Sequence, residues 1–352
     1  MQPLKEYKNI LVFNPSFIGD SVLTTPLIKG LKKLYPQGRI TFCVRPESAD
    51  LFKGLPFIDE VLVYDKRGRA KGIKGALSFA AYVKKRNFDL AVNVHKSFRS
   101  TMIMKLAGLP YVVGFKSAVM SFLFDKTVVR DMTKHEVERN LALLAPLCSG
   151  FSLEKAKELG GRPECYIDKD LSAKAKLYFN SVSGDKKLIG ISPGSVWATK
   201  RYPAEHFAET AKILTDKGFA VALFGSSSDI EAVDNFYKHF RGECYDFVAK
   251  SPIGELPALL SCLDVFITND SGPMHIASGA GVPCVAIFGA TVPSIGFAPY
   301  DDKSIIVENL NIDCRPCAIH GGNKCPKGHF KCMKDISPQQ VAASAIKLWE
   351  RN

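Results

Sequence analysis

The chain has 352 residues, of which 46% are hydrophobic and 23% charged, a globular composition that excludes disordered and collagen-like proteins. This length fits two domains of about 150–200 residues. The net charge of +12 lies entirely in the first part: residues 1–150 carry 24 Lys and Arg against 12 Asp and Glu, whereas residues 151–352 carry 23 of each. Such a one-sided excess indicates either a basic solubilising surface or an anionic partner, namely nucleic acid, a membrane surface or an acidic substrate.

Predicted strands and helices alternate along the whole chain. Short apolar runs predict strands at residues 9–14, 39–44, 61–64, 88–94, 188–192, 219–224, 264–268 and 283–288. A helical pattern runs from the end of the first strand to about residue 34. Others lie at residues 76–86, 98–107, 135–147, 203–217, 229–240, 256–262, 273–281 and 337–349. The alternation predicts an α/β protein of two doubly wound, Rossmann-like domains.

We place the first domain at residues 1–170 and the second at 171–336, joined in the polar stretch 150–186. Residues 337–352 form a closing helix that could pack back on the first domain. No GxGxxG motif follows either first strand and no GxxxxGK[ST] motif is present, which disfavours a nicotinamide dehydrogenase or a P-loop NTPase.

The N-terminal residues MQPLKEYKN lack the apolar core of a signal peptide. No apolar run approaches the ~20 residues that span a bilayer. We therefore expect a cytoplasmic protein that can still touch the membrane from that side.

The first predicted strand is followed by the turn NPSFIGD, which ends at Asp20. A carboxylate at this point can act as general base on a substrate hydroxyl. The competing interpretation is that Asp20 only caps the helix that begins here, a common role for Asp. The segment Thr25-Pro26 offers an alternative helix start, which would leave Asp20 in the loop.

Two further strand–turn–helix junctions in the second half carry polar residues. The segment NDSGPMH places Asp270, Ser271, Gly272 and His275 at the start of a helix, where amide groups favour phosphate. The loop SPGSVWATKRYP brings Ser195 and Lys200 to the start of another helix. Taken singly, each residue is more often an ordinary cap, a packed histidine or an exposed lysine; together at strand ends they favour a site.

The PSFIGD turn, the PGSVWATKRYP loop and the NDSGPMHIASGAGVP segment, in this order, resemble the ADP-heptose lipopolysaccharide heptosyltransferases, glycosyltransferase family 9, and are most similar to the heptosyltransferase II group. The resemblance implies a GT-B fold, with two Rossmann-like domains facing a central cleft that closes on the substrates. It implies inverting transfer of L-glycero-D-manno-heptose from ADP-heptose to the lipopolysaccharide inner core, with the second heptose added to heptosyl-Kdo2-lipid A.

The resemblance also implies residue roles. Asp20 matches the catalytic base, Lys200 the donor-contacting lysine and Ser195 the hydroxyl residue near the diphosphate. Asp270, Ser271, Gly272 and His275 match the donor-binding segment, and Asp229 is a candidate for the adenosine-side carboxylate. The basic first domain would bind the anionic, lipid-anchored acceptor on the inner membrane face, with Lys66, Arg67, His95, Lys96 and Arg99 as candidate contacts.

No Asp-x-Asp pair stands at a suitable strand end, so we expect catalysis without a metal cofactor. Four cysteines, Cys314, Cys317, Cys325 and Cys332, have a spacing that partly resembles a structural zinc site. Only the first two form a close pair, so free thiols or disulfides remain as alternatives.

Three other functions are weighed against this one. A heptosyltransferase I-type enzyme, or another family member with a different donor or acceptor, would share the same motifs. A nucleotide-sugar epimerase would not need a basic acceptor domain. A nucleic-acid-binding protein should show interleaved basic and aromatic residues or a helix-turn-helix, and neither is evident, so we expect no nucleic acid partner.

Overall fold

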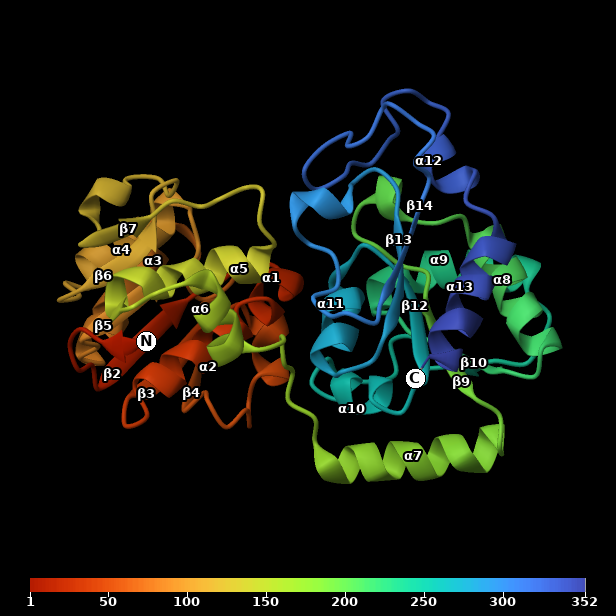
Figure 1. The fold of residues 1–352 in the computed structure, drawn as a ribbon, viewed down its shortest axis with the longest axis horizontal. Helices are drawn as coiled ribbons and strands as arrows, with labels where there is room; N and C mark the ends of the chain where they lie inside the picture. Colours follow the sequence, from red (N-terminus) through yellow and green to blue (C-terminus); the bar gives the residue numbers. More distant parts are fainter. Residues whose placement is uncertain (352) are drawn as a thin grey trace. The chain divides into compact units, whose positions relative to one another are not determined.

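The computed structural model describes residues 1–351, which divide into two compact units, Met1–Tyr166 and a second that begins at Ile167 (Figure 1). The division precedes the border predicted at residue 170, which falls inside helix α7 (Lys169–Ser183). Helix α7 belongs to the second unit because it packs on α10 (Leu256–Leu260), where the hydroxyl groups of Ser172 and Ser261 are 3.1 Å apart.

The first unit is built on a six-stranded parallel sheet in the order β4-β3-β2-β5-β6-β7. Its strands are β2 (Asn9–Phe13), β3 (Arg39–Val44), β4 (Glu60–Val63), β5 (Leu90–Asn93), β6 (Val112–Phe115) and β7 (Lys126–Val128), and a short antiparallel pair joins β1 (Gln2–Pro3) to β8 (Cys148–Ser149). In chain order the strands read 3-2-1-4-5-6, the order of doubly wound nucleotide-binding folds.

Helices cover both faces of this sheet. They are α1 (Ile18–Val22), α2 (Thr25–Leu34), α3 (Gly72–Lys85), α4 (Phe98–Leu106), α5 (Glu136–Leu141) and α6 (Leu153–Gly160), with 3₁₀ helices η1 (Pro46–Leu51), η2 (Ser121–Leu123) and η3 (Ala142–Leu147). Helices α3 and α4 pack together over a core that includes Leu11 and Phe13. Helices α2, α5 and α6 form a second group that packs together. The helix predicted at 135–147 becomes 3₁₀ after Leu141, where Pro146 has no amide hydrogen to donate.

The second unit repeats the plan with the sheet order β11-β10-β9-β12-β13-β14, again 3-2-1-4-5-6 and parallel throughout. The strands are β9 (Leu188–Ser192), β10 (Ala220–Leu223), β11 (Tyr245–Asp246), β12 (Val265–Asn269), β13 (Cys284–Phe288) and β14 (Ile305–Glu308). The helices, besides α7 and α10, are η4 (Ala198–Lys200), α8 (Ala204–Asp216), η5 (Ser227–Asp229), α9 (Ile230–His239), α11 (Gly272–Gly279), η6 (Pro293–Ile295), α12 (Lys331–Lys334) and α13 (Pro338–Glu350). Both units therefore confirm the predicted doubly wound α/β class.

The closing helix α13 packs within the second unit, beside α8 and over β12, β13 and β14 (Figure 1). Its apolar stripe, which includes Val341, Ala345 and Leu348, is buried in the core of that unit, and Trp349 contacts the edge of Phe219. The expectation that this helix packs back on the first domain is wrong, because its apolar face covers the sheet of the second unit. Within residues 1–351 no helix combines the length and hydrophobicity needed to cross a bilayer.

Candidate active site

The strand order opens one crevice in each unit. Chain connections leave the two central strands in opposite directions, so a ligand can bind outside their carboxyl ends, between β2 and β5 in the first unit and between β9 and β12 in the second. Asp20 follows β2, and His95 and Lys96 follow β5. Ser195 follows β9 and Asp270 follows β12, so the main candidates lie at these two points.

Asp20 lies in the first turn of α1 but does not cap it. The N-cap is Phe17, and the backbone carbonyl of Asp20 accepts a hydrogen bond from Thr24 Oγ1 at 2.8 Å. Burial, followed by the negative charge of Glu136, raises the pKa of the Asp20 carboxyl group from 3.8 to about 6. The charges of Lys96 and Arg130 and a hydrogen bond to the Phe17 backbone limit that rise. Asp20 is therefore ionised at pH 7 and can still accept a proton.

Arg130, one of these cations, is held by a buried ion pair with Glu136 that was not predicted from the sequence. The carboxylate of Glu136 accepts from both Arg130 and Arg139, and the Arg139 side chain is fully buried. Arg139 also donates to the carbonyls of Asp131 and Met132, at 3.0 and 2.7 Å. These bonds tie the segment before α5 to the helix and so fix Arg130 beside Asp20. Only Glu136 and Arg139 stand at helical spacing, whereas Arg130 precedes α5, so no local pattern in the sequence marks this cluster.

The predicted acceptor residues of the β4–α3 connection lie near the Asp20 loop. Lys66 donates from Nζ to the Pro15 carbonyl at 3.3 Å, and burial together with Arg45, Arg67 and Arg99 lowers its pKa. Arg45, which the sequence reasoning also missed, is buried, pairs with Glu47 and lies over the Phe17 ring at 5.4 Å. The structure thus gathers a cluster of cations around this crevice.

His95 differs from the other acceptor candidates in its charge. Burial, and then the charges of Lys66 and Lys96, lower its pKa to about 4, so the imidazole is neutral at pH 7. Its Nδ1 is 2.5 Å from Ser100 Oγ. His95 can therefore contribute hydrogen bonds but not positive charge to acceptor binding, whereas Lys96 on the same loop is exposed.

In the second unit, Lys200 and Asp270 form a buried pair. Lys200 Nζ is 2.6 Å from Asp270 Oδ2, and the Thr291 hydroxyl donates to the same oxygen at 2.6 Å. Because both charged side chains are largely desolvated, the lysine is held in one position at the end of the sheet. Thr291 follows β13 and has no pattern in the sequence that would single it out.

Asn269, the last residue of β12, connects the loops on either side of it. Its amide nitrogen donates to the carbonyls of Pro193 and Gly194 at 3.0 and 3.1 Å, and its oxygen accepts from the Tyr202 amide at 2.9 Å. Within the same loop Arg201 Nε donates to the Ser195 carbonyl at 2.8 Å. Ser195 is thereby buried in a loop whose backbone is held at four points.

Asp229 reaches this same loop. A Cβ atom on Gly194 would lie 2.1 Å from the Asp229 carboxylate, so only glycine fits there. The carboxylate accepts from the amide and hydroxyl of Ser226 at 2.8 and 2.7 Å, closing a capping box at η5. The structure therefore brings Asp229 beside the Ser195 loop, while also giving it the ordinary capping role.

Helix α11 begins in the segment NDSGPMH. Ser271 is its N-cap in extended conformation but makes no side-chain cap, because its hydroxyl donates to the Asn269 carbonyl at 3.3 Å. Gly272 starts the helix and His275 is buried in its first turns. Pro273 has no amide hydrogen and the Met274 amide donates to the Ser271 carbonyl at 3.2 Å, so the Gly272 amide is the donor at this helix start that can bind an anion.

The cysteine-bearing segment that precedes α12 braces this site from two sides. The buried Arg315 donates to the carbonyls of Phe288, Gly289 and Thr291, which fixes the turn that carries the Thr291 hydroxyl. Farther along, Gly322 donates to Thr199 Oγ1 at 2.8 Å and accepts from the Thr199 amide at 2.9 Å. The cysteine spacing of this segment predicts a metal site, and nothing in its sequence predicts these contacts.

The zinc site itself is not assembled. Within residues 1–351 no group of three or more His, Cys, Asp and Glu side chains is arranged to hold a metal ion. The Cys317 thiol donates to the Cys314 carbonyl at 3.4 Å, and Cys314 Sγ is 3.9 Å from His329 Nε2. Cys314, Cys317, Cys325 and Cys332 form no disulfide, and their side chains are not arranged as a tetrahedral zinc site requires.

We expect Asp20→Asn to stabilise the fold at neutral and higher pH. Because the folded pKa of about 6 lies above the ordinary 3.8, ionised Asp20 costs stability above pH 6, on the order of 3 kcal/mol. The cost is absent near pH 4. Thermal unfolding should therefore show a higher midpoint for the variant near pH 8 and no advantage near pH 4.

Asp131→Asn is the control of opposite sign for this experiment. Hydrogen bonds from the hydroxyl and amide of Thr133 lower the pKa of Asp131, so its substitution should lose stability near pH 8. An Asp20→Asn protein less stable than wild type near pH 8 would contradict the desolvation of Asp20.

We expect Lys200→Met to destabilise the second unit by about 3–5 kcal/mol, because it leaves the Asp270 carboxylate buried without its cation. The double variant Lys200→Met/Asp270→Asn should regain most of that loss. Urea unfolding of the single and double variants measures their free energies of unfolding.

Lys212→Met is the control, because it breaks an exposed pair with Asp216 and should change stability little. A Lys200→Met protein that loses as little stability as this control would show that the Lys200–Asp270 pair is not buried.

Known proteins are similar to this chain in both sequence and fold. The sequence profile of glycosyltransferase family 9 (heptosyltransferase) matches residues 76–325. The chain is 27% identical over 344 residues to lipopolysaccharide heptosyltransferase 2 of Escherichia coli K12, covering 94% of this chain and 96% of that protein.

Two solved structures resemble the whole chain. The glycosyl transferase family 9 protein from Veillonella parvula superposes with a TM-score of 0.87 at 27% identity, covering 99% of both chains. The E. coli ADP-heptose LPS heptosyltransferase II superposes with a TM-score of 0.78 at 25% identity, covering 97% of this chain and 99% of the other. Since the family profile spans most of the chain and both structures match nearly all of it, the chain belongs to glycosyltransferase family 9, the heptosyltransferase family, and is a glycosyltransferase with a GT-B fold.

Proposed function

We propose that the enzyme transfers L-glycero-D-manno-heptose from ADP-heptose to the lipopolysaccharide inner core and adds the second heptose, with inversion at the anomeric carbon. The relative from E. coli named lipopolysaccharide heptosyltransferase 2 matches nearly the full length, which supports the choice of donor and acceptor class. The observation that carries the proposal is the Asp20 carboxylate, which lies in α1 after β2. Burial raises its pKa to about 6, and the charges of Lys96 and Arg130 act on it.

Asp20 is the proposed general base. The acceptor hydroxyl oxygen attacks the anomeric carbon from the face opposite to the diphosphate, and its proton passes to the Asp20 carboxylate. A base with a pKa near 6 is ionised at neutral pH and accepts a proton more readily than an ordinary aspartate. Lys66, Arg67, Lys96 and Arg99 contact the anionic acceptor, and His95 adds a neutral hydrogen-bonding group.

The second unit binds ADP-heptose and stabilises the leaving group. As the bond between the anomeric carbon and the β-phosphate oxygen breaks, negative charge grows on ADP. Lys200 and the Gly272 amide at the start of α11 supply positive charge for it, and the Ser195 loop lies beside them. Asp229 is the proposed carboxylate on the adenosine side.

We propose that this chemistry needs no metal cofactor. Lysine and helix amides can neutralise the diphosphate, the role that a divalent cation otherwise takes. The one Asp-x-Asp in the sequence, Asp168-Lys169-Asp170, caps α7, where Asp168 accepts from the amides of Asp170 and Leu171. It is thus committed to a helix end.

Transfer by purified enzyme should therefore continue at an unchanged rate in excess EDTA, and added Mg²⁺ should not raise it. The measurement is ADP release in both conditions, together with the zinc content of protein purified without chelator. Loss of activity in EDTA that Mg²⁺ restores would overturn the metal-independent mechanism, and stoichiometric zinc would restore the predicted structural site.

The proposed acceptor is anchored in a bilayer, so we also propose a cytoplasmic enzyme in peripheral contact with the inner membrane. Nucleic acid is not part of this proposal, because the basic residues near Asp20 are assigned to the acceptor. A heptosyltransferase I-type activity, in which the first heptose is added to Kdo2-lipid A, is the alternative that shares the same motifs.

Transfer assays on two acceptors distinguish these activities. We expect ADP release with ADP-heptose and heptosyl-Kdo2-lipid A, and little with Kdo2-lipid A. The opposite preference would favour the heptosyltransferase I alternative, and no transfer to either acceptor would end the proposal. With the wild type, kcat/KM should rise as the pH increases through about 6, because Asp20 must be ionised.

In the same assay Asp20→Asn should lower kcat by at least about 100-fold, the usual contribution of a general base, with little change in the KM for ADP-heptose. The stability measurement described above confirms that the variant is folded. Near-normal turnover of the variant would remove Asp20 as the base.

A further inference from the structure

The first unit exposes large apolar side chains among lysines and arginines. We call this the apolar–basic surface. Its apolar members, with their exposed fractions, are Ile73 (79%), Leu77 (48%), Phe98 (55%), Val119 (50%) and Phe122 (77%). Ile73 and Leu77 stand one turn apart on α3, Phe98 begins α4, and Val119 and Phe122 lie between β6 and β7. Single exposed apolar residues are common, but five on neighbouring elements are not.

Much of this surface lies at the edge of the sheet that holds Asp20. Ile73 follows β4, Phe98 follows β5 and Val119 follows β6, so all three stand beyond the carboxyl ends of parallel strands. The Val119 amide donates to the Lys96 carbonyl at 3.0 Å, and Thr101 Oγ1 donates to the Val119 carbonyl at 2.7 Å. Val119 is therefore in direct contact with the loop that carries an acceptor candidate.

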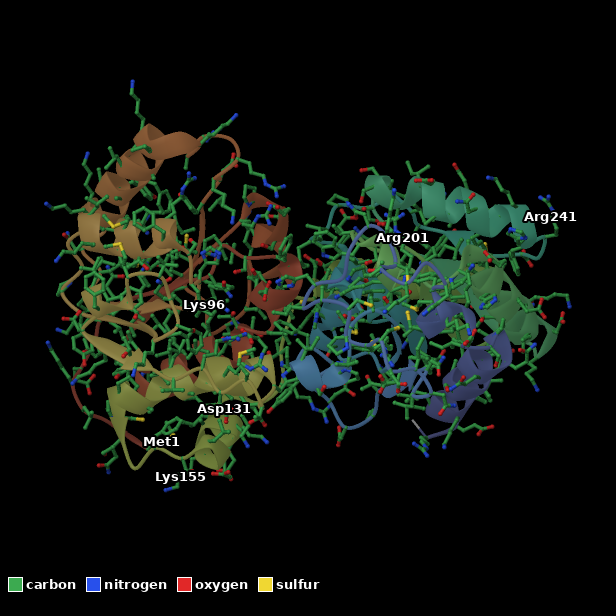
Figure 2. All side chains as sticks on the ribbon, turned by 90° about the horizontal axis from the view of Figure 1, so that it is seen from above. Met1, Lys96, Asp131, Lys155, Arg201 and Arg241 are labelled. Atoms are coloured by element: carbon green, nitrogen blue, oxygen red, sulfur yellow. The ribbon has the colours of Figure 1, made fainter. Side chains whose placement is uncertain are left out.

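Nearly all of the chain's excess charge lies in the same segment. Residues 66–124 contain 12 Lys and Arg and one acidic residue, a net charge of +11 out of the chain's +12. That acidic residue, Asp89, precedes β5 at the opposite edge, where it accepts from the amides of Lys8 and Asn9. Nitrogen-tipped side chains project from the orange helix α3 at the upper left of Figure 2.

We propose that the apolar–basic surface docks the enzyme on an anionic lipid bilayer, an inference that rests on the proposed lipid-anchored acceptor. Exposed Lys71, Lys74 and Lys116 would attract anionic headgroups, while Ile73 and Phe122 enter the interface between headgroups and acyl chains. An acceptor held in the bilayer reaches Asp20 only if this edge faces the membrane. Single-stranded nucleic acid is favoured less, because three of the five apolar members are aliphatic and offer no stacking surface.

Sedimentation with vesicles tests this surface directly. The probe is the full chain mixed with vesicles of phosphatidylethanolamine and phosphatidylglycerol at about 7:3, compared with vesicles of phosphatidylcholine alone. We expect binding to the anionic vesicles only, weakened by salt. Equal binding to both vesicles, or no binding to either, overturns the proposal.

Two pairs of variants locate the contact. Ile73→Asp and Lys71→Glu/Lys74→Glu should each lower the vesicle partition coefficient by about tenfold or more. The matched controls lie in the second unit: Leu177→Asp on α7, where Leu177 is 71% exposed, and Lys186→Glu/Lys187→Glu before β9. Controls that lose as much binding as the test variants would show a diffuse charge effect and contradict a defined surface.

Activity separates this proposal from the proposed function. With a detergent-solubilised acceptor, Ile73→Asp and Lys71→Glu/Lys74→Glu should transfer heptose at the wild-type rate. With acceptor embedded in anionic vesicles, the variants should transfer heptose more slowly, by about the factor that they lose in vesicle binding.

If the wild type transfers heptose but the variants bind vesicles normally, the docking surface is wrong and the function stands. If no acceptor is used, vesicle binding still tests the surface, and duplex DNA that displaces the vesicles at physiological salt would overturn it.

Discussion

The direction in which the chain leaves its central strands determines where chemistry can occur in this protein. Parallel strands need crossover connections, and in the order 3-2-1-4-5-6 the connections after the first and fourth strands diverge. Only at that point do strand ends remain uncovered by the chain itself. Asp20 follows the first strand of one unit, and Asp270 follows the fourth strand of the other. Both candidate carboxylates therefore owe their positions to backbone topology rather than to local motifs.

The two carboxylates have different surroundings, and this difference separates their roles. Asp270 has a lysine at 2.6 Å and the Thr291 hydroxyl on the same oxygen, which commits it to holding Lys200. Asp20 is desolvated near Glu136 and has cations nearby, but the structure gives it no ion pair. A carboxylate that is already paired makes a poor base, whereas a desolvated one with a pKa near 6 can take up a proton at neutral pH. These surroundings support the proposed division, with proton transfer in the first unit and charge stabilisation in the second.

The sequence predicted most strands and the main site loops because apolar runs and turn residues are local signals. It missed the short pair β1–β8 and four strands of the two main sheets: β7, β11 and β14 are short and partly exposed, whereas β6 is buried. It also gave the wrong partner for α13, because an amphipathic pattern does not say which core it joins. In the site, Asp20, Lys200 and Asp270 lie in segments that follow predicted strands, and they were found from the sequence. Thr291, Arg315 and Glu136 act through contacts with residues distant in the chain, or through burial, and no local pattern marks them.

The cations of the first unit have two electrostatic effects that depend on each other. Lys96 and Arg130 limit the rise in the pKa of Asp20, and they also attract an anionic acceptor. When a carboxylate or phosphate of the acceptor binds beside them, its charge offsets theirs, and the pKa of Asp20 must rise further. By linkage, acceptor binding and proton uptake by Asp20 favour each other. Under the proposed mechanism, Asp20 has its highest proton affinity when the hydroxyl to be deprotonated is bound, and binding energy from the acceptor's remote anionic groups contributes to the proton transfer.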